Sequence, residues 1–137
     1  MKNFLKELGG ILLKEMGLSS SNSYDSFGNR TGYTKQINNS YYDYDNYGNQ
    51  DGYTKKVSDK YTHYDNLGNE LGHLKENAYG YNVCDKYGNC NEIYRKTSDG
   101  YKIYDKYGNE KGYIKKDASG RMVEYDRFGN RRGYFGN

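Results

Sequence analysis

A six-residue phrase occurs six times in this 137-residue chain, and it constrains the fold more than any other feature. Its copies begin at residues 24, 44, 64, 84, 104 and 125 and read YDSFGN, YDNYGN, YDNLGN, CDKYGN, YDKYGN and YDRFGN. The spacing is twenty residues, with a single step of twenty-one. A fixed period in this range indicates a repeat architecture in which each repeat is one supersecondary unit.

Each copy has the chemistry of a tight turn. The Asp side chain can accept hydrogen bonds from backbone amides that follow it, and the Gly can take the positive φ that closes a short hairpin with a bulge. Tyr, Ile, Thr and Val flank the turns and favour strands, so each repeat is predicted to be one β-hairpin. The predicted turn residues are Asp25, Gly28, Asp45, Gly48, Asp65, Gly68, Asp85, Gly88, Asp105, Gly108, Asp126 and Gly129.

Successive hairpins need a second kind of turn between them. The sequence predicts these second turns at SDK (58–60), AYG (78–80), SDG (98–100) and ASG (118–120). An unbroken register outward from the turn of the fifth repeat places Tyr104 opposite Glu110 and Tyr101 opposite Tyr113. Tyr101 and Tyr113 are then expected on one face of the sheet and Tyr104 on the other.

The residue before each turn Gly is large and apolar, although a free hairpin tip is normally polar. These six residues are Phe27, Tyr47, Leu67, Tyr87, Tyr107 and Phe128. They are predicted to be buried, either as a shared apolar centre if the hairpins ring an axis, or as a ladder along one edge of an open array.

Residues 21–137 are therefore predicted to form an all-β domain of six tandem hairpins of about 20 residues each. The outer strands of such an array expose unpaired backbone unless they are capped or joined. The sequence shows no polar capping repeat, which a closed ring would explain and filament assembly would explain as well. The predicted fold is a closed, flower-like shallow barrel, and an open single-layer β-solenoid is the alternative.

Residues 1–20 are predicted to form an amphipathic helix and a linker. Gly9 and Gly10 would each cost about 1 kcal/mol relative to Ala in a helix interior, so this helix is expected to need a surface on which to form. Three roles fit it: a lid on the β-array, an anchor on a membrane surface, or a docking helix for a protein partner. The apolar residues at helical spacing are Phe4, Leu5, Leu8, Ile11, Leu12 and Met16.

The stretches YDKYGNEKGYIKK, YDNYGNQDGYTKK and YDSFGNRTGYTKQ resemble the hairpin repeats of the bacterial β-flower proteins, whose units also read as an aromatic residue, Asp, a turn Gly and a Gly-aromatic pair. The resemblance covers residues 24–137 and implies a shallow symmetric barrel with hairpin petals and an apolar centre, similar in outline to the Tubby-type lipid-binding domain. A weaker similarity to MORN repeats rests on Tyr61, Gly68 and Gly72, although Asp65 stands where those repeats have Trp. Choline- and glucan-binding repeats also resemble the stretch YYDYDNYG, but they carry Trp, which this chain lacks.

Little in the sequence indicates catalysis or metal binding. The two histidines, His63 and His73, lie in one repeat, and His73 holds a position that is Tyr in four other repeats, which favours a structural role. Each turn offers one carboxylate and one amide, fewer ligands than a calcium loop needs. We predict no enzyme activity, no cofactor and no metal site.

Cys84 replaces the Tyr that begins the other copies of the phrase, and Cys90 is predicted to lie directly across the hairpin from it. Direct cross-strand neighbours can approach disulfide distance. In a reducing cytoplasm the two are expected to remain thiols. A compensating pair of packing residues is favoured over a redox or metal role.

A basic residue recurs at the same position of five repeats: Lys35, Lys55, Lys75, Arg95 and Lys115. With Tyr side chains one or two residues away, this basic column could follow a polyanion such as nucleic acid, phosphoinositide headgroups or an acidic polysaccharide. The other interpretation is a solvated edge whose lysines discourage strand aggregation. The net charge of +3 is too small to favour nucleic acid as the partner.

Together these features predict a non-enzymatic binding or scaffold module that associates with a membrane surface through the helix, aided by the basic column. The alternatives are a self-assembling structural protein that forms filaments and a carbohydrate-binding repeat protein. The expected partners are a lipid surface, a protein bound through the helix, or further copies of the chain. No apolar run reaches the roughly 18 residues of a membrane span, and charges interrupt the N-terminal apolar segment, which favours a cytoplasmic protein peripheral to the membrane.

Overall fold

The computed structural model describes residues 4–136, with side chains from residue 8 onward. One helix, α1 (Phe4–Met16), precedes twelve strands in this part of the chain. The strands are β1 (Ser20–Asp25), β2 (Arg30–Ile37), β3 (Ser40–Asp45), β4 (Gln50–Val57), β5 (Lys60–Asp65), β6 (Glu70–Asn77), β7 (Gly80–Asp85), β8 (Cys90–Lys96), β9 (Gly100–Asp105), β10 (Glu110–Lys116), β11 (Met122–Asp126) and β12 (Arg131–Gly136).

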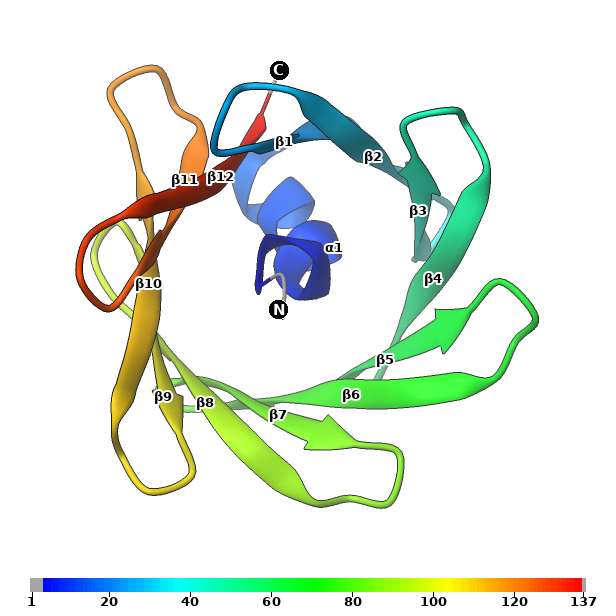
Figure 1. Cartoon of the computed structure of the whole chain (residues 1–137). Coiled ribbons are helices and arrows are strands. Elements are labelled where there is room, and N and C mark those ends of the chain that lie inside the picture. The colour runs from blue at the N-terminus through cyan, green and yellow to red at the C-terminus, as the bar shows by residue number, and fades with distance from the viewer. Residues whose placement is uncertain (1–3, 137) are drawn as a thin grey trace.

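The strands form one closed antiparallel barrel. Each strand pairs with its neighbours in the chain, and β1 pairs with β12, which sets Ser23 opposite Phe135 and Tyr24 opposite Tyr134. Figure 1 shows the hairpins arranged around a ring, with the last hairpin beside the first. The predicted closed barrel is confirmed and the open solenoid is wrong, because closure pairs the edges that an open array would expose.

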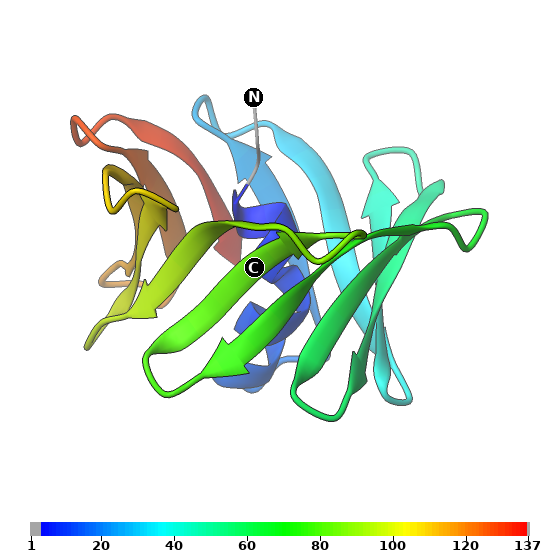
Figure 2. The ribbon, with the colours of Figure 1, turned by 90° about the horizontal axis from the view of Figure 1, so that it is seen from below.

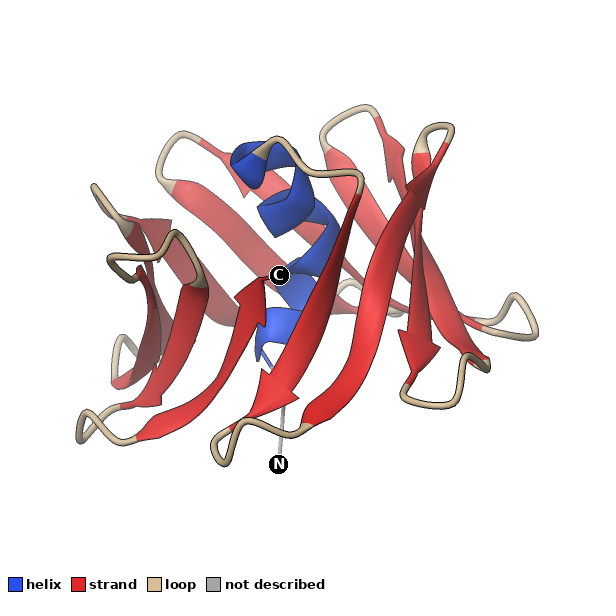
Figure 3. Cartoon of the chain, turned by 90° about the horizontal axis from the view of Figure 1, so that it is seen from above, coloured by secondary structure: helices blue, strands red, loops and turns tan. Residues whose placement is uncertain are grey.

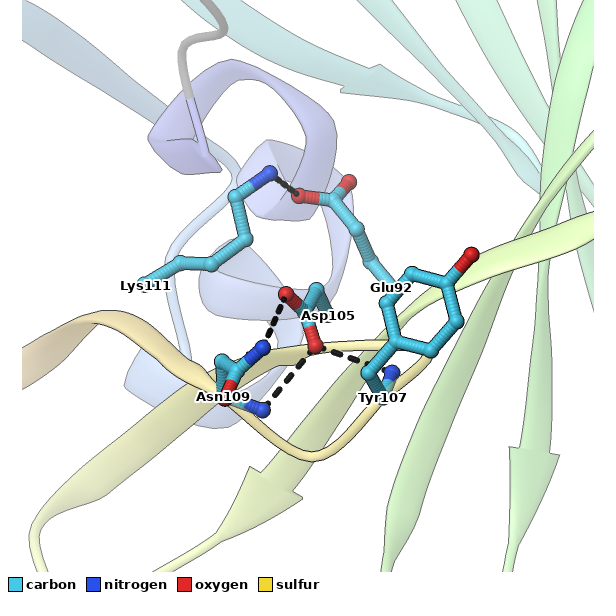
Figure 4. A network of polar contacts seen from close by, with 5 residues as sticks. All are labelled: Glu92, Asp105, Tyr107, Asn109 and Lys111. Atoms are coloured by element: carbon cyan, nitrogen blue, oxygen red, sulfur yellow. Dashed lines mark hydrogen bonds and ion pairs between the residues drawn. The ribbon is translucent and has the colours of Figure 1, made fainter.

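The repeated phrase forms the turn of every hairpin, as predicted. In the fifth repeat Asp105 Oδ1 accepts hydrogen bonds from the backbone amides of Tyr107 and Asn109, both at 2.9 Å, and Oδ2 accepts one from Asn109 Nδ2 at 3.1 Å (Figure 4). Gly108 has φ +86°, the left-handed conformation that favours glycine. The other five copies repeat these bonds and this conformation.

These bonds also change the acidity of the six turn carboxylates. In each turn the amide of the Asn that ends the phrase makes the largest contribution and lowers the pKa of the Asp below its ordinary value. A carboxylate that accepts several amide hydrogen bonds is favoured in its charged form. The turns are therefore held best when their Asp residues are ionised.

Alternate connections of an antiparallel barrel lie at opposite ends. The six phrase turns are thus all at one end, which we call the motif-turn end, and the connections between hairpins are at the other, the second-turn end. The side views in Figures 2 and 3 show these two rims. The predicted division of each repeat into a hairpin and a second turn is confirmed.

A β-bulge in each hairpin changes the register just beyond the turn. In the fifth repeat Glu110 lies opposite Tyr104, as predicted, but Tyr113 lies opposite Lys102 rather than Tyr101. A bulge sets two residues of one strand against one of the other, so every later pair shifts by one. The predicted register is wrong beyond the first pair, and Tyr101 faces the interior while Tyr113 lies on the outer wall.

The helix lies inside the barrel, as Figures 1 and 2 show. Leu8, Leu12 and Leu13 have no exposed surface, and Ile11 has 3%. Met16 is half-buried against the same core, whereas the side chains of Phe4 and Leu5 lie outside the described part. The helix is therefore neither a lid over one end nor a surface element: it is the centre of the core.

Glycines in the helix allow this placement. The helix packs against β1, β2, β3, β11 and β12. A Cβ on Gly10 would lie 2.6 Å from the Tyr41 ring, and one on Gly9 would lie 3.1 Å from Thr34 Oγ1. The helix propensity lost at these two positions is the cost of bringing the helix backbone this close to the wall.

The inner wall supplies the rest of the core and ties the helix at its C-terminal end. Inward-facing Tyr61, Tyr81 and Tyr101 are buried with the helix leucines. The Tyr101 hydroxyl donates a hydrogen bond to the Glu15 carboxylate of the helix, and Lys96 Nζ lies 3.8 Å from that carboxylate. Burial, followed by the bond to Glu15, raises the pKa of Tyr101, so it stays protonated and able to donate.

The six residues before the turn glycines are not in this core, and the prediction that they form a buried centre is wrong. They are 74–89% exposed: Phe27, Tyr47, Leu67, Tyr87, Tyr107 and Phe128. Two physical reasons account for this. A ring of twelve strands spreads its turns around the circumference (Figure 1), and the helix occupies the axis where they would have to meet.

Candidate functional site

Tyrosines cover much of the outer wall at the junctions between repeats. Face-to-face ring pairs join neighbouring repeats with centroid distances of 4.5–4.9 Å: Tyr24–Tyr134, Tyr33–Tyr44, Tyr53–Tyr64 and Tyr113–Tyr125. Such stacked pairs add about 0.5–1.5 kcal/mol beyond the area that they bury. These rings therefore pack between repeats, and stacking covers one face of each ring.

The two histidines lie on opposite faces of the wall. His73 takes the outer ring position at the junction of β6 and β7, opposite Cys84, where other junctions have Tyr. His63 faces inward from β5, and its Nδ1 lies 2.7 Å from Thr54 Oγ1. Within residues 8–136, no three His, Cys, Asp or Glu side chains are grouped so that they could hold a metal ion.

Cys84 and Cys90 are directly opposite one another, as predicted, with their Cα atoms 3.9 Å apart. They form a disulfide, so the expectation that both remain thiols is wrong for this structure. The disulfide lies next to the bulge of the fourth hairpin and covalently closes that hairpin near its motif turn. It stands where the other repeats use a Tyr in the wall.

The predicted basic column lies on the outer wall, toward the second-turn end. Its five side chains are exposed, because they alternate with the inward-facing residues of their strands. The pairing of strands adds two further lysines to it: Lys60 lies directly opposite Lys75, and Lys102 lies directly opposite Arg95. We call this set the basic wall: Lys35, Lys55, Lys60, Lys75, Arg95, Lys102 and Lys115.

Exposed apolar residues accompany the basic wall at the second-turn end. Ile37, Val57 and Tyr79 are 41%, 65% and 72% exposed, and they lie at three successive second turns. The sequence did not indicate this set, because Ile37 and Val57 end their strands, Tyr79 lies in a turn, and the three differ in residue type. Their common position appears only once the connections are known to share one end of the barrel.

Two ion pairs lie at the inner rim of the motif-turn end, one between β8 and β10 and one between β11 and β12. Glu92 stands where the other repeats have a second Gly, and its Oε2 lies 3.1 Å from Lys111 Nζ (Figure 4). Glu124 Oε2 lies 3.3 Å from Arg132 Nε. Both glutamates are only 3% exposed, so they belong to the interior, and the bulge residues Lys111 and Arg132 reach inward to neutralise them.

On the β3 to β8 side of the barrel there is an open cavity of about 480 Å³. Inward-facing side chains and bulge residues of β3 to β8 line it, among them Asp43, Asp51, His63, Leu71, Val83 and Asn91. The Thr34 hydroxyl donates a 2.7 Å hydrogen bond to Asp43 Oδ1, and Thr54 Oγ1 is hydrogen-bonded to His63 Nδ1 at the same distance. Sequence reasoning missed this cavity, because it depends on which residues the bulges turn inward.

Comparisons with known proteins add little. No family model matches the chain, and no curated protein matches it either. Among solved structures, the X-ray structure of a protein from Arabidopsis thaliana aligns with 10% identity over 85% of this chain and 80% of that one, with a TM-score of 0.38. This likeness is too weak to indicate a family or a function. No helix among the described residues is long and apolar enough to cross a bilayer.

Proposed function

We propose that the chain is a non-enzymatic binding module that docks on anionic membrane surfaces through its basic wall. The observation that carries this proposal is the direct cross-strand pairing of like charges, Lys60 with Lys75 and Arg95 with Lys102. Like charges in this position destabilise a sheet. Anionic headgroups would turn that repulsion into attraction, at about 1 kcal/mol for each basic residue near the surface.

The exposed apolar residues beside the basic wall fit the same partner. Ile37, Val57 and Tyr79 lie at the rim that would face the bilayer. Aromatic and aliphatic side chains at such a rim enter the interface between headgroups and acyl chains, while lysines beside them stay with the headgroups. A polyanion in solution would use the charges but would gain nothing from these apolar residues.

The route to the membrane differs from the one predicted from sequence. The apolar face of α1 lies in the core, so docking through the helix would require the helix to leave the barrel interior. Docking through the basic wall leaves the fold intact. The closed sheet also offers no unpaired end strand for filament growth, and stacking leaves each paired tyrosine ring only one face for a sugar.

Sedimentation with lipid vesicles tests this proposal. The full chain should bind vesicles of phosphatidylserine and phosphatidylcholine, and it should bind pure phosphatidylcholine at least tenfold more weakly. The double variant Lys60→Gln/Lys75→Gln should lose about thirtyfold in affinity, from about 1 kcal/mol for each charge removed.

The matched control removes two lysines from the motif-turn end. Lys86 and Lys106 are also exposed, and their ammonium groups lie 5.2 and 5.3 Å from the ring centroids of Tyr87 and Tyr107. Lys86→Gln/Lys106→Gln should leave vesicle binding within about threefold of wild type. Equal losses in the two double variants, or equal binding to anionic and neutral vesicles, would refute docking through the basic wall.

A further inference from the structure

Arginine is unevenly distributed among the repeats. Apart from Arg95, every arginine of the chain lies in or beside the first and last hairpins, where the barrel closes: Arg30, Arg121, Arg127, Arg131 and Arg132. The residue after the Gly-Asn pair is Arg in these two repeats, whereas the four repeats between them carry Gln, Glu, Cys and Glu there. The outer wall at the closure therefore differs in chemistry from the rest of the barrel.

Two of these arginines meet on one tyrosine ring. Arg131 begins β12 just after the motif turn, and Arg121 belongs to the second turn that precedes β11, so they approach from opposite ends of the last hairpin. Their Cζ atoms lie 4.7 and 4.4 Å from the centroid of the Tyr134 ring. Tyr24 is stacked on this ring at 4.5 Å, which leaves the other face of the ring for the two guanidinium groups.

A glycine makes room for Arg121. Gly136 holds the strand position that carries a member of the basic column in the five preceding repeats. A Cβ on Gly136 would lie 2.8 Å from Arg121 Cγ, so a side chain there would displace Arg121. Asp117 also holds Arg121, with its Oδ2 3.0 Å from Arg121 Nε. A group that is fixed before a ligand arrives loses little entropy on binding.

The two arginines carry more positive charge than the residues around them neutralise. Asp117 pairs with Arg121, but Arg131 is exposed and forms no ion pair with any described residue. The Tyr134 ring attracts both cations but does not cancel their repulsion. A guanidinium presents its N–H donors in a planar fork that matches two oxygens of a phosphate group. An anion that accepts hydrogen bonds from both arginines would therefore remove the repulsion between them.

We infer that Arg121 and Arg131 bind the phosphate group of a soluble phosphomonoester. Such a group carries a charge of about −1.5 to −2 at neutral pH and three acceptor oxygens, which suits two guanidinium groups. A soluble compound is favoured over a lipid because Arg131 lies toward the motif-turn end, away from the rim that we propose to face the bilayer. The inference does not depend on membrane docking, since Lys60 and Lys75 lie across the barrel on β5 and β6.

An NMR titration of the isotopically labelled full chain with phenyl phosphate at low salt tests this inference. The amide signals of Arg121 and Arg131 and of their neighbours should shift. Benzenesulfonate has nearly the same shape but a single charge, and it serves as the ligand control. Phenyl phosphate should bind at least about fivefold more tightly than benzenesulfonate, because its additional charge strengthens the hydrogen bonds from both arginines.

Three variants show whether the arginine pair is the site. Arg131→Gln should weaken phenyl phosphate about tenfold, and Arg131→Lys about threefold, because lysine keeps the charge but loses the planar fork. Arg127→Gln is the matched control: Arg127 is an exposed arginine of the same hairpin, but its Cζ lies over Phe128, 4.6 Å from the ring centroid. It should bind phenyl phosphate within about twofold of wild type, because it does not contact Tyr134. No shifts at millimolar phenyl phosphate, equal affinity for benzenesulfonate, or equal losses in Arg131→Gln and Arg127→Gln would overturn the inference.

Vesicles of phosphatidic acid and phosphatidylcholine distinguish a soluble phosphomonoester from the same group on a lipid. Arg131→Gln should sediment with them as the wild type does, within about threefold, since docking uses the basic wall. A loss as large as the loss for phenyl phosphate would overturn the assignment to a soluble ligand. If wild-type protein bound no vesicles, membrane docking would fail, whereas the phenyl phosphate titration would keep its meaning.

Discussion

The two ends of the barrel are built from the same repeats, but the repeats agree at one end and differ at the other. At the motif-turn end all six turns use the same Asp cap and the same Gly with a φ of 85–88°. At the second-turn end Asn38 and Ser58 take positive φ without being glycine, whereas Gly120 does so in the last connection. The invariant end carries the conformation that every hairpin needs. The variable end carries the charges and exposed apolar residues on which docking depends.

Both ends rest on the same core, so the largest effect should come from the helix that forms it. Leu12→Ala should lower the free energy of unfolding by about 2–5 kcal/mol, because Leu12 is fully buried inside the barrel. Leu67→Ala, at an exposed motif turn, should change it by less than about 0.5 kcal/mol. Urea unfolding followed by circular dichroism measures both. Equal effects would mean that the helix is not the core.

The disulfide is a feature of the motif-turn end alone. Its removal should cause the next largest loss of stability. Cys84 and Cys90 enclose a short loop with a sequence separation of 6, for which loop entropy gives a stabilisation of about 2 kcal/mol. A reductant should lower the urea midpoint of the wild type accordingly. The variant Cys84→Ala/Cys90→Ala should not respond to reductant. An unchanged wild-type midpoint would show that the disulfide does not form in solution.

Low pH should destabilise the folded protein by protonating the six Asp carboxylates of the motif-turn end. Their pKa values are lowered in the folded state, so the stability that they contribute is present above the unfolded pKa of about 4 and is lost as the pH falls through the folded values. Asp105→Asn keeps an acceptor oxygen but cannot titrate. It should therefore reduce the loss of stability between pH 5 and pH 2, and Asp105→Asn/Asp126→Asn should reduce it further. The same pH dependence in all three proteins would contradict this role of the turn carboxylates.

The smallest change in the free energy of unfolding should appear at the second-turn end, and there the substitution should stabilise the protein. Lys60→Gln removes a like-charge neighbour of Lys75, so at low salt it should raise the free energy of unfolding, by up to about 0.5 kcal/mol. The gain should disappear near 1 M salt, where such repulsion is screened. The same substitution weakens vesicle binding if docking uses this wall. A loss of stability in Lys60→Gln would show that the two lysines do not repel one another.

Much of the fold could be predicted because the same turn sequence occurs six times. The turn chemistry of Asp105, Gly108 and their equivalents follows from local hydrogen bonding and from the φ that glycine tolerates, and neither depends on distant parts of the chain. The further bulge beyond the turn, at Lys111 and its equivalents, could not be predicted so easily, since it adds one residue without a characteristic residue type. A register that ignores it places Tyr113 on the wrong face.

The predictions that failed concern what fills the centre. Phe27 and its equivalents are apolar, and apolar residues suggest burial, but the helix already occupies the axis and the ring holds the turns apart. Gly9 and Gly10 were expected only to weaken the helix, so that it would need a surface on which to form, whereas close packing against Tyr41 and Thr34 requires them. Five residues of the basic wall could be found from their period. Lys60 and Lys102 could be assigned to the basic wall only once the strand pairing was known.

Tryptophan fluorescence tests most directly whether the second-turn end, rather than the motif-turn end, meets the membrane. The chain contains no Trp, so Val57→Trp and Leu67→Trp each introduce a single reporter at an exposed apolar position, one at each end. With anionic vesicles, Val57→Trp should shift to shorter wavelength and be quenched by brominated lipid, while Leu67→Trp should do neither. A shift and quenching of Leu67→Trp with none for Val57→Trp would contradict the account, because the membrane would then lie at the wrong end of the barrel.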